Sequence, residues 1–260
     1  MKILVVEDKE MHRQSARETL AGHEVTIHSS FDQAIDAMKV EIDEENVQKV
    51  LTEAGFSRKP EQEDTQEYRK AYWKAHSEAE KASVIPFPFE TVLVDMMMPM
   101  SRRTLASDAY NWGEEVPYGF VLALRAALRG ARFIAVVTDT NHHKGAMSAA
   151  LDHLGFAYYR SMRPNFTING AKCLFIHTPF VKDLVKDAPC YSCRENPGVC
   201  GCCRGTGTGY ITHKPCHMCT DGKCTHCKGT GKADTTVEER KDWGQVLRDL
   251  TSEALPDSEE

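Results

Sequence analysis

The cysteines constrain this chain most, because nearly all of them fall in one short segment. Nine of the ten cysteines lie between Cys190 and Cys227, and eight of the nine form four C-x-x-C pairs. In a reducing compartment, dense C-x-x-C pairs are more often metal ligands than disulfides. Eight thiolates in four pairs suit two tetrahedral zinc sites. The four pairs are Cys190/Cys193, Cys200/Cys203, Cys216/Cys219 and Cys224/Cys227.

Two of these pairs carry a longer repeat. The segments that begin at Cys200 and Cys224 both read C-x-x-C-x-G-x-G, and glycines permit the tight turns of a zinc knuckle. The repeat resembles the cysteine-rich zinc domain of DnaJ-type co-chaperones, although the other two pairs lack the glycines. In that family the pairs nest, first with fourth and second with third. The resemblance implies one zinc ion on Cys190, Cys193, Cys224 and Cys227, and a second on Cys200, Cys203, Cys216 and Cys219.

The other residues of the cysteine-rich segment, and the sequence before it, limit the functions that we expect for this segment. Cys202 is left over, and His213, His217 and His226 are alternative ligands that we interpret as exposed loop residues. No J-domain precedes the segment, so we expect no recruitment of an ATP-driven chaperone. We expect a surface that binds a protein partner, with RNA as a less favoured ligand. Such a segment has almost no apolar core, so metal binding and folding should be one event.

The first 187 residues alternate between short apolar runs and helical segments, which predicts an α/β fold with a parallel, doubly wound sheet. The expected strands are Lys2–Val6, Glu24–His28, Thr91–Val94, Phe133–Val137 and Lys172–Ile176. The expected helices are Met11–Leu20, Phe31–Met38, Phe120–Leu128, Gly145–Leu154 and a short closing helix, Phe180–Lys186.

Acidic residues follow two of the expected strands. Glu7 and Asp8 end the first strand, and Asp95 ends the strand before a loop that contains Pro99. Three clustered carboxylates repel one another, and Mg²⁺ would relieve that repulsion and neutralise phosphate charge during transfer. The alternative is that these acids only end strands and cap helices. Two acid-tipped strands, together with Thr138 at the end of a third, favour phosphoryl chemistry.

Four segments of this region resemble the signature segments of response-regulator receiver domains, in the same order. They are KILVVED at 2–8, VLVDMMMP at 92–99, AVVT at 135–138 and FIHTPF at 175–180. The resemblance implies a flavodoxin-like, five-stranded parallel sheet of order 2-1-3-4-5. It also implies that Asp95 accepts a phosphoryl group from a histidine kinase or a small phosphodonor.

The resemblance assigns further roles within the site. Glu7, Asp8 and Asp95, with the Met97 carbonyl, would hold Mg²⁺. Thr138 would bond the phosphoryl oxygen, Phe175 would be the aromatic that changes rotamer, and Gly119 matches the glycine at the start of the third helix.

One position departs from the family pattern. A lysine that contacts the acyl phosphate normally precedes the last-strand proline, but here Thr178 precedes Pro179. Threonine cannot replace the charge-assisted hydrogen bond of an ammonium. We expect either a substitute from His142, His143 or Lys144, or an atypical receiver with weakened switching. For the run 142–144 itself, a polar helix start is the interpretation that we favour. The loop 100–118 is also longer than the family's and predicts an altered lid.

Two segments interrupt or follow this pattern. Residues 40–88 are rich in Glu, Lys and Gln, and a narrow apolar stripe through Tyr68 and Tyr72 predicts an inserted helical hairpin rather than a partly disordered acidic loop. Residues 235–255 predict an amphipathic helix opened by a capping box of Thr236 and Glu239. We expect this helix to pack back on the protein rather than dock a partner, and residues 256–260 to fray.

These observations predict three parts: a receiver-like domain at 1–187, a double zinc module with a β-hairpin at 188–233, and a C-terminal helix and tail at 234–260. The formal charge of −6 disfavours broad electrostatic binding of nucleic acid. No apolar run is long enough to cross a bilayer, so we expect a cytoplasmic protein.

The expected function is signal transduction in a two-component phosphorelay. As a response-regulator-like protein, the chain would catalyse only its own phosphorylation and dephosphorylation. The alternative is a chaperone-like, zinc-dependent binding module on a receiver scaffold that does not switch. A thiol oxidoreductase ranks lower, because paired motifs favour metal-bound thiolates.

Overall fold

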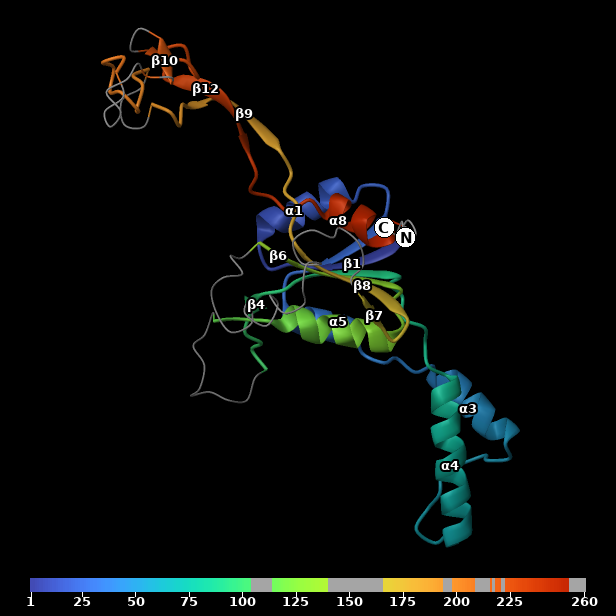
Figure 1. Ribbon diagram of the computed structural model, residues 1–260. Coiled ribbons are helices and arrows are strands. Elements are labelled where there is room, and N and C mark those ends of the chain that lie inside the picture. The colour runs from blue at the N-terminus through green and yellow to red at the C-terminus, as the bar shows by residue number, and fades with distance from the viewer. Residues whose placement is uncertain are drawn as a thin grey trace, which may run out of the picture. The chain divides into compact units, whose positions relative to one another are not determined.

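The computed structural model describes residues 1–103, 114–139, 166–193, 198–208, 216, 218–220 and 223–252. The chain divides into two compact units. Unit 1 comprises Met1–Pro179 and Lys241–Glu260, and unit 2 comprises Phe180–Arg240. The chain therefore leaves unit 1 at Pro179 and returns to it at Lys241. This return brings the C-terminal helix, red in Figure 1, beside the first helix, blue in the same view.

Unit 1 is built on a mostly parallel sheet, which confirms the predicted α/β class. The described strands lie in the order β2-β1-β3-β6-β8-β7. The parallel strands are β1 (Lys2–Val6), β2 (Glu24–His28), β3 (Thr91–Asp95), β6 (Phe133–Thr138) and β8 (Ala171–His177). Strand β7 (Phe166–Ile168) was not expected and pairs antiparallel with β8. Asn169 and Gly170 join the two at φ of 47° and 82°, the left-handed conformation that a tight hairpin turn needs.

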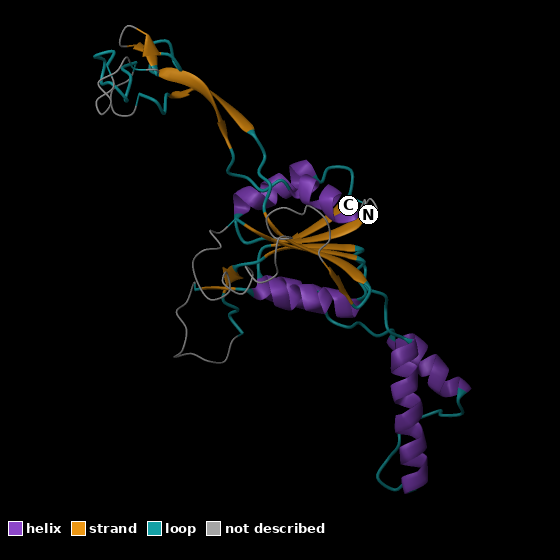
Figure 2. Cartoon of the chain, viewed as in Figure 1, coloured by secondary structure: helices purple, strands orange, loops and turns teal. Residues whose placement is uncertain are grey.

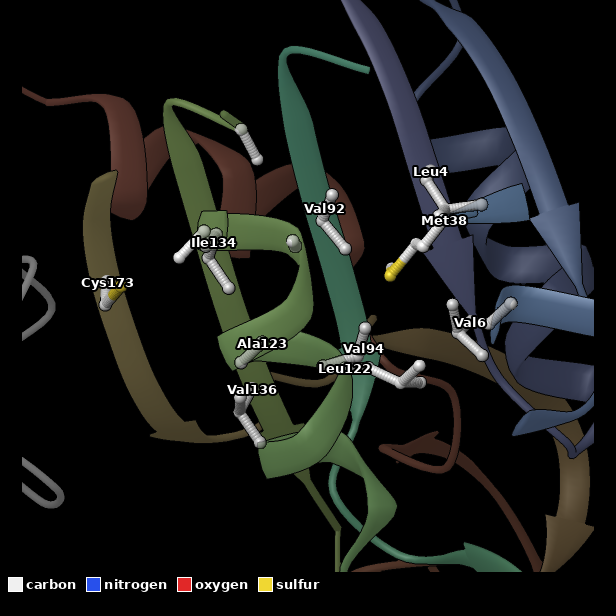
Figure 3. Close-up of a cluster of buried hydrophobic side chains, with 14 of the residues drawn as sticks. Leu4, Val6, Met38, Val92, Val94, Leu122, Ala123, Ile134, Val136 and Cys173 are labelled. Carbon is white, nitrogen blue, oxygen red and sulfur yellow. The ribbon is translucent and has the colours of Figure 1, made fainter. Parts of the chain in front are cut away.

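Helices cover both faces of this sheet (Figure 2). Helices α1 (Glu10–Thr19) and α8 (Trp243–Thr251) share one apolar cluster with Ile3, Val5 and Leu93. Helices α2 (Phe31–Ala37) and α5 (Tyr118–Arg129) share another with the alternate residues of the same strands. Figure 3 shows this second cluster, with Val94 beside Leu122 of α5. Successive strand residues point to opposite faces, so continuous apolar runs fill both layers.

The predicted inserted hairpin consists of helices α3 (Glu44–Glu53) and α4 (Gln66–Ala82). The two helices bury a small apolar cluster of their own, centred on Tyr72 and Leu51. Asp43 and Thr65 cap the helices by accepting hydrogen bonds from the main-chain N–H groups of Asn46 and Tyr68. Tyr72, from the apolar stripe read in the sequence, thus lies in the contact surface between α3 and α4, and Tyr68 packs on Phe56, which follows α3.

Unit 2 contains a two-stranded ribbon and a short hairpin. The ribbon pairs β9 (Asp183–Pro189) antiparallel with β12 (Lys232–Val237), and the hairpin pairs β10 (Cys219–Thr220) with β11 (Lys223–Cys224). The predicted helix Phe180–Lys186 is wrong, because Leu184 and Val185 pair with Thr236 and Thr235 of β12. A partner strand so distant in sequence overrides local helical composition.

The predicted C-terminal helix begins later than expected. Thr236 lies in β12, so it is not a helix cap, and α8 starts at Trp243. The cap is Asp242, whose carboxylate accepts a hydrogen bond of 2.8 Å from the Gln245 N–H. β-branched Thr235, Thr236 and Val237 favour the strand.

The loop 100–118 is described in part: β4 (Met98–Pro99) pairs with β5 (Glu115–Val116) at its base. The predicted helix 145–154, the run 142–144 and the tail 256–260 lie outside the described residues. Among the described helices, none combines the length and apolar character that crossing a lipid bilayer requires.

Candidate functional site

Three carboxylates gather at one edge of the unit 1 sheet. Strands β1 and β3 are parallel neighbours with Val6 opposite Val94, so the residues that follow them emerge together. Glu7, Asp8 and Asp95 each offer an oxygen, and these atoms all lie within 4.8 Å of one another. Glu7 and Asp95 are buried, with exposed fractions of 0% and 2%. The acids predicted from two separate strands therefore form one cluster.

A lysine that the sequence analysis missed lies among these acids. The Lys241 ammonium donates to Glu7 Oε2 at 2.7 Å and to Asp95 Oδ1 at 2.8 Å, and its side chain is fully buried. Lys241 is far from Asp95 in sequence and belongs to the segment that returns to unit 1 before α8. Its only local signal is its place beside the D-x-x-Q helix start at Asp242.

Burial and charge set the ionisation of this cluster. Burial raises the pKa of Asp95 to about 7; the charge of Lys241 opposes this shift, and the charge of Glu7 adds to it. Burial also raises the pKa of Glu7 against the pull of Lys241. Burial by itself would lower the pKa of Lys241, but the neighbouring carboxylates of Asp95 and Glu7 raise it. The ammonium is therefore the charged partner that stabilises two buried carboxylates.

The carboxylate of Asp8 is the least satisfied member of the cluster. Its Oδ1 atom is buried and has no hydrogen-bond partner among the described residues. A buried carboxylate oxygen of this kind calls for a donor or a cation. Oxygen-rich clusters of this kind are the donor type that hard cations prefer.

Gly119 allows the first turn of α5 to lie close to Asp95. Its N–H donates to the Met96 carbonyl at 3.1 Å, and a Cβ at this position would lie 2.5 Å from the main-chain oxygen of Asp95. Only glycine permits so close an approach without a backbone shift. The first turn of α5 thus packs directly on the end of β3, where Asp95 lies.

The remaining predicted site residues surround this edge. Thr138 is buried at the end of β6, and its carbonyl accepts from the Thr178 N–H at 2.9 Å. The Thr178 hydroxyl donates to the Pro179 carbonyl. Phe175 is 7% exposed and packs edge-on against Phe120 with ring centres 4.8 Å apart. Met97 lies partly buried in the loop after Asp95.

In unit 2, the cysteines form two tetrads that could each bind a zinc ion, as predicted. The Sγ atoms approach most closely between pairs: Cys193 and Cys227 are 3.4 Å apart, and Cys203 and Cys219 are 3.3 Å apart. The grouping is nested, first pair with fourth and second with third. The tetrads are Cys190, Cys193, Cys224 and Cys227, and Cys200, Cys203, Cys216 and Cys219.

The two C-x-x-C-x-G-x-G repeats adopt the same local structure. Arg204 and Lys228, each directly after the second cysteine, have φ of 51° and 50°. The hydroxyls of Thr206 and Thr230 donate to the carbonyls of Cys203 and Cys227, both at 2.7 Å. The two halves of the module are therefore equivalent turns, each joined to a C-x-x-C pair from elsewhere in the chain.

Each half also holds one thiol in a favourable environment for ionisation. Burial opposes ionisation of Cys227, but hydrogen bonds from Cys193 and from the main chain of Gly231 and Gly229 lower its pKa to about 6. Burial likewise opposes ionisation of Cys203. Hydrogen bonds from Cys219 and nearby glycines nevertheless lower the pKa of Cys203 to about 7. The thiolate is the form that binds metal.

Two of the leftover candidate ligands, Cys202 and His226, are described and belong to neither tetrad. Cys202 is exposed, and the His226 ring packs against Tyr191 with centres 4.7 Å apart. His213 and His217 lie outside the described residues.

Comparisons with protein-family profiles, with curated proteins and with solved structures find no match to this chain.

Proposed function

We propose that unit 1 is a receiver-like phosphoryl acceptor and that unit 2 is a zinc-binding interaction module coupled to it. Asp95 would take the phosphoryl group from a histidine kinase or a small phosphodonor. One observation carries this proposal: the Lys241 ammonium lies 2.8 Å from Asp95 Oδ1, where an acyl phosphate needs a cation. This lysine takes the place of the one that Thr178 does not provide.

The charges of the cluster support a divalent metal at the same edge. Glu7, Asp8 and Asp95 carry three negative charges when ionised, and Lys241 offsets one of them. The excess of two negative charges matches one Mg²⁺, and the unpaired Asp8 oxygen offers a ligand. The Met97 carbonyl is the further ligand we propose. When bound, Mg²⁺ would neutralise charge on the transferring phosphoryl group.

The chain's own residues would then do the chemistry. An oxygen of Asp95 attacks the phosphorus of the donor, and the bond from phosphorus to the donor's leaving group breaks with its electron pair. Lys241 shifts from the Asp95 carboxylate toward a phosphoryl oxygen, and Thr138 bonds another. In this proposal Thr138 moves toward the phosphoryl group and Phe175 moves with it. The buried packing of Phe175 against Phe120 therefore changes.

The path from Asp95 to unit 2 follows the chain itself. The two ends of the unit 2 segment are tied in unit 1, where the Asp242 N–H donates to the Pro179 carbonyl at 2.8 Å. Lys241 directly follows Arg240, and the Arg240 guanidinium holds Asp183 of β9 with bonds of 2.8 and 2.9 Å. A displacement of Lys241 would therefore act on the base of the β9–β12 ribbon.

Exposed apolar side chains of unit 2 favour a protein partner over RNA. Leu184 is 60% exposed and Tyr191 is 67% exposed. Large exposed apolar and aromatic residues are typical of protein contacts.

The test is phosphoryl incorporation from radiolabelled acetyl phosphate with and without Mg²⁺. The wild-type protein should incorporate label only with Mg²⁺, and Asp95→Asn should incorporate none. Asp36→Asn is the matched control, since Asp36 is an acid on α2 that pairs with Arg103. Undiminished incorporation in Asp95→Asn would overturn the assignment.

A second candidate is a zinc-dependent binding module on a scaffold that does not switch. Lys241 favours it in one respect, because the lysine is fully buried and already pairs with both Glu7 and Asp95. A closed ion-pair network of this kind would need no ligand. Absence of any response to Mg²⁺ and acetyl phosphate, with partner binding that depends only on zinc, would select this candidate.

A further inference from the structure

The main chain of Lys241 is held at both of its polar atoms by α1. Its N–H donates to His12 Nδ1 at 3.3 Å, and its carbonyl accepts from the Ser15 hydroxyl at 2.6 Å. His12 and Ser15 are buried, with exposed fractions of 1% and 0%. Two polar side chains inside an apolar helix interface are costly unless their bonds matter to the structure.

The imidazole of His12 is itself held from the other side. Its Nδ1 accepts a main-chain N–H, so the ring proton lies on Nε2, which donates to Asp139 Oδ2 at 3.1 Å. Lys9 also donates to this carboxylate oxygen, at 2.8 Å. The indole N–H of Trp243, two residues after Lys241, donates to the His12 carbonyl at 3.0 Å. Both ring nitrogens of His12 therefore have partners, and the ring orientation is determined.

This arrangement follows from where Lys241 enters unit 1. Lys241 does not continue from strand β8, because residues 180–240 separate the two. The sheet therefore does not set its position directly, and contacts with its neighbours must do so. The Pro179 carbonyl holds the next residue, Asp242, while α1 holds Lys241 itself.

We infer that His12 and Asp139 are positioning residues for Lys241, an inference that rests on the proposed function. Asp139 fixes the His12 ring with its Nδ1 lone pair toward Lys241, and His12 fixes the main chain from which the ammonium reaches Glu7 and Asp95. Asp139 directly follows Thr138, so the same pair links the lysine to the threonine end of β6.

Two substitutions at position 12 test the two hydrogen bonds of the His12 ring separately. In His12→Asn the amide oxygen replaces Nδ1 and can still accept from Lys241. In His12→Gln the amide extends toward the Nε2 position and keeps the contact with Asp139 only. We expect acetyl phosphate labelling of His12→Gln to be about 10- to 100-fold slower, because small misplacements of a catalytic group have effects of this size. His12→Asn should stay within about threefold of the wild-type rate.

A measurement without phosphodonor separates positioning from loss of fold. In protein labelled with ¹⁵N-lysine, the buried Lys241 ammonium should give a slowly exchanging resonance that Lys241→Met removes. His12→Gln and Asp139→Ala should shift or broaden this resonance, and His12→Asn should retain it. Gln14→Ala, on the exposed side of α1, is the control and should change neither measurement.

The outcomes distinguish the two proposals. A wild-type ammonium resonance and labelling rate in His12→Gln would overturn the positioning role and leave the phosphoryl acceptor intact. A protein that takes no label at all would defeat the proposed function, while the ammonium resonance would still decide whether His12 holds Lys241.

Discussion

The two units hold their candidate sites together by different means. In unit 1 the acids lie at the edge of a sheet whose strands are buried in two apolar clusters. In unit 2 the buried residues of the two clusters are the cysteines themselves. Unit 1 therefore has a core that is independent of its site, whereas in unit 2 the site is the core. A ligand should modulate the first and determine the fold of the second.

Metal removal should have the largest effect, and it should affect the two units differently. Structural zinc contributes about 10–16 kcal/mol of apparent folding free energy in small modules, so chelation should unfold unit 2 and spare unit 1. Limited proteolysis with mass spectrometry should show cleavage confined to 180–240. Cys203→Ser should act like chelation, and Cys202→Ser, which alters the exposed cysteine outside both tetrads, should not. Protease resistance that survives verified metal loss would contradict the prediction.

Removal of the buried cation should be the largest single effect in unit 1. Lys241→Met leaves the Glu7 and Asp95 carboxylates without their shared donor, at a cost of about 3–5 kcal/mol in the free energy of unfolding. Urea denaturation of the zinc-loaded protein at pH 8 measures this change. The double variant Lys241→Met with Asp95→Asn should recover part of the loss, because one of the buried charges is gone. A double variant as unstable as Lys241→Met would show that the charges do not cause the loss.

Gly119→Ala should have a smaller effect at the same edge. The new Cβ would lie 2.5 Å from the Asp95 oxygen and 2.7 Å from the Met96 Cα, so the first turn of α5 must shift. We expect a loss of about 1–3 kcal/mol, as for other overpacked sites, and slower labelling of Asp95. Val121→Ala, at a half-exposed position of the same helix, is the control. Its free energy of unfolding should be within about 0.5 kcal/mol of the wild-type value.

The cap of α8 should give the smallest effect. Asp242→Ala removes the acceptor for the Gln245 N–H and should cost about 1 kcal/mol of unit 1 stability. Asp242→Asn keeps an acceptor and should behave almost as wild type in thermal unfolding. Equal stability of all three proteins would mean that contacts of Trp243 and Val246, and not the cap, fix the start of the helix.

Features encoded by local sequence patterns could be predicted. The central strands are continuous apolar runs, so strands such as Thr91–Asp95 and Phe133–Thr138 could be placed almost to the residue. The zinc ligands could be predicted because each C-x-x-C pair is a local motif, whereas their nested grouping into tetrads was implied only by the resemblance to DnaJ-type zinc domains. The acids at Glu7, Asp8 and Asp95 were found because parallel neighbouring strands end at a common edge.

Features that depend on distant partners could not be predicted. The run after Phe180 has helical composition, and only its pairing with β12 makes it a strand. Lys241 belongs to no recognised motif, and the substitute cation was expected from His142, His143 or Lys144, in the run after Thr138. Its role depends on a chain that leaves the sheet at Pro179 and returns after unit 2. His12 was missed for the same reason, since its polar partners are Asp139, directly after β6, and Lys241, before α8.

The return of the chain at Lys241 makes unit 1 separable into two pieces. A single peptide-bond cleavage between β9 and β12 would place Asp95 and Lys241 on different polypeptides. The packing of α8 and its flanking hydrogen bonds would join them within unit 1, and the β9–β12 ribbon would join them within unit 2. The shorter piece, which carries Trp243, Val246, Leu247 and Leu250, would be a complementing peptide. Reassociation of the two fragments would then rebuild the acid–lysine cluster from separate chains.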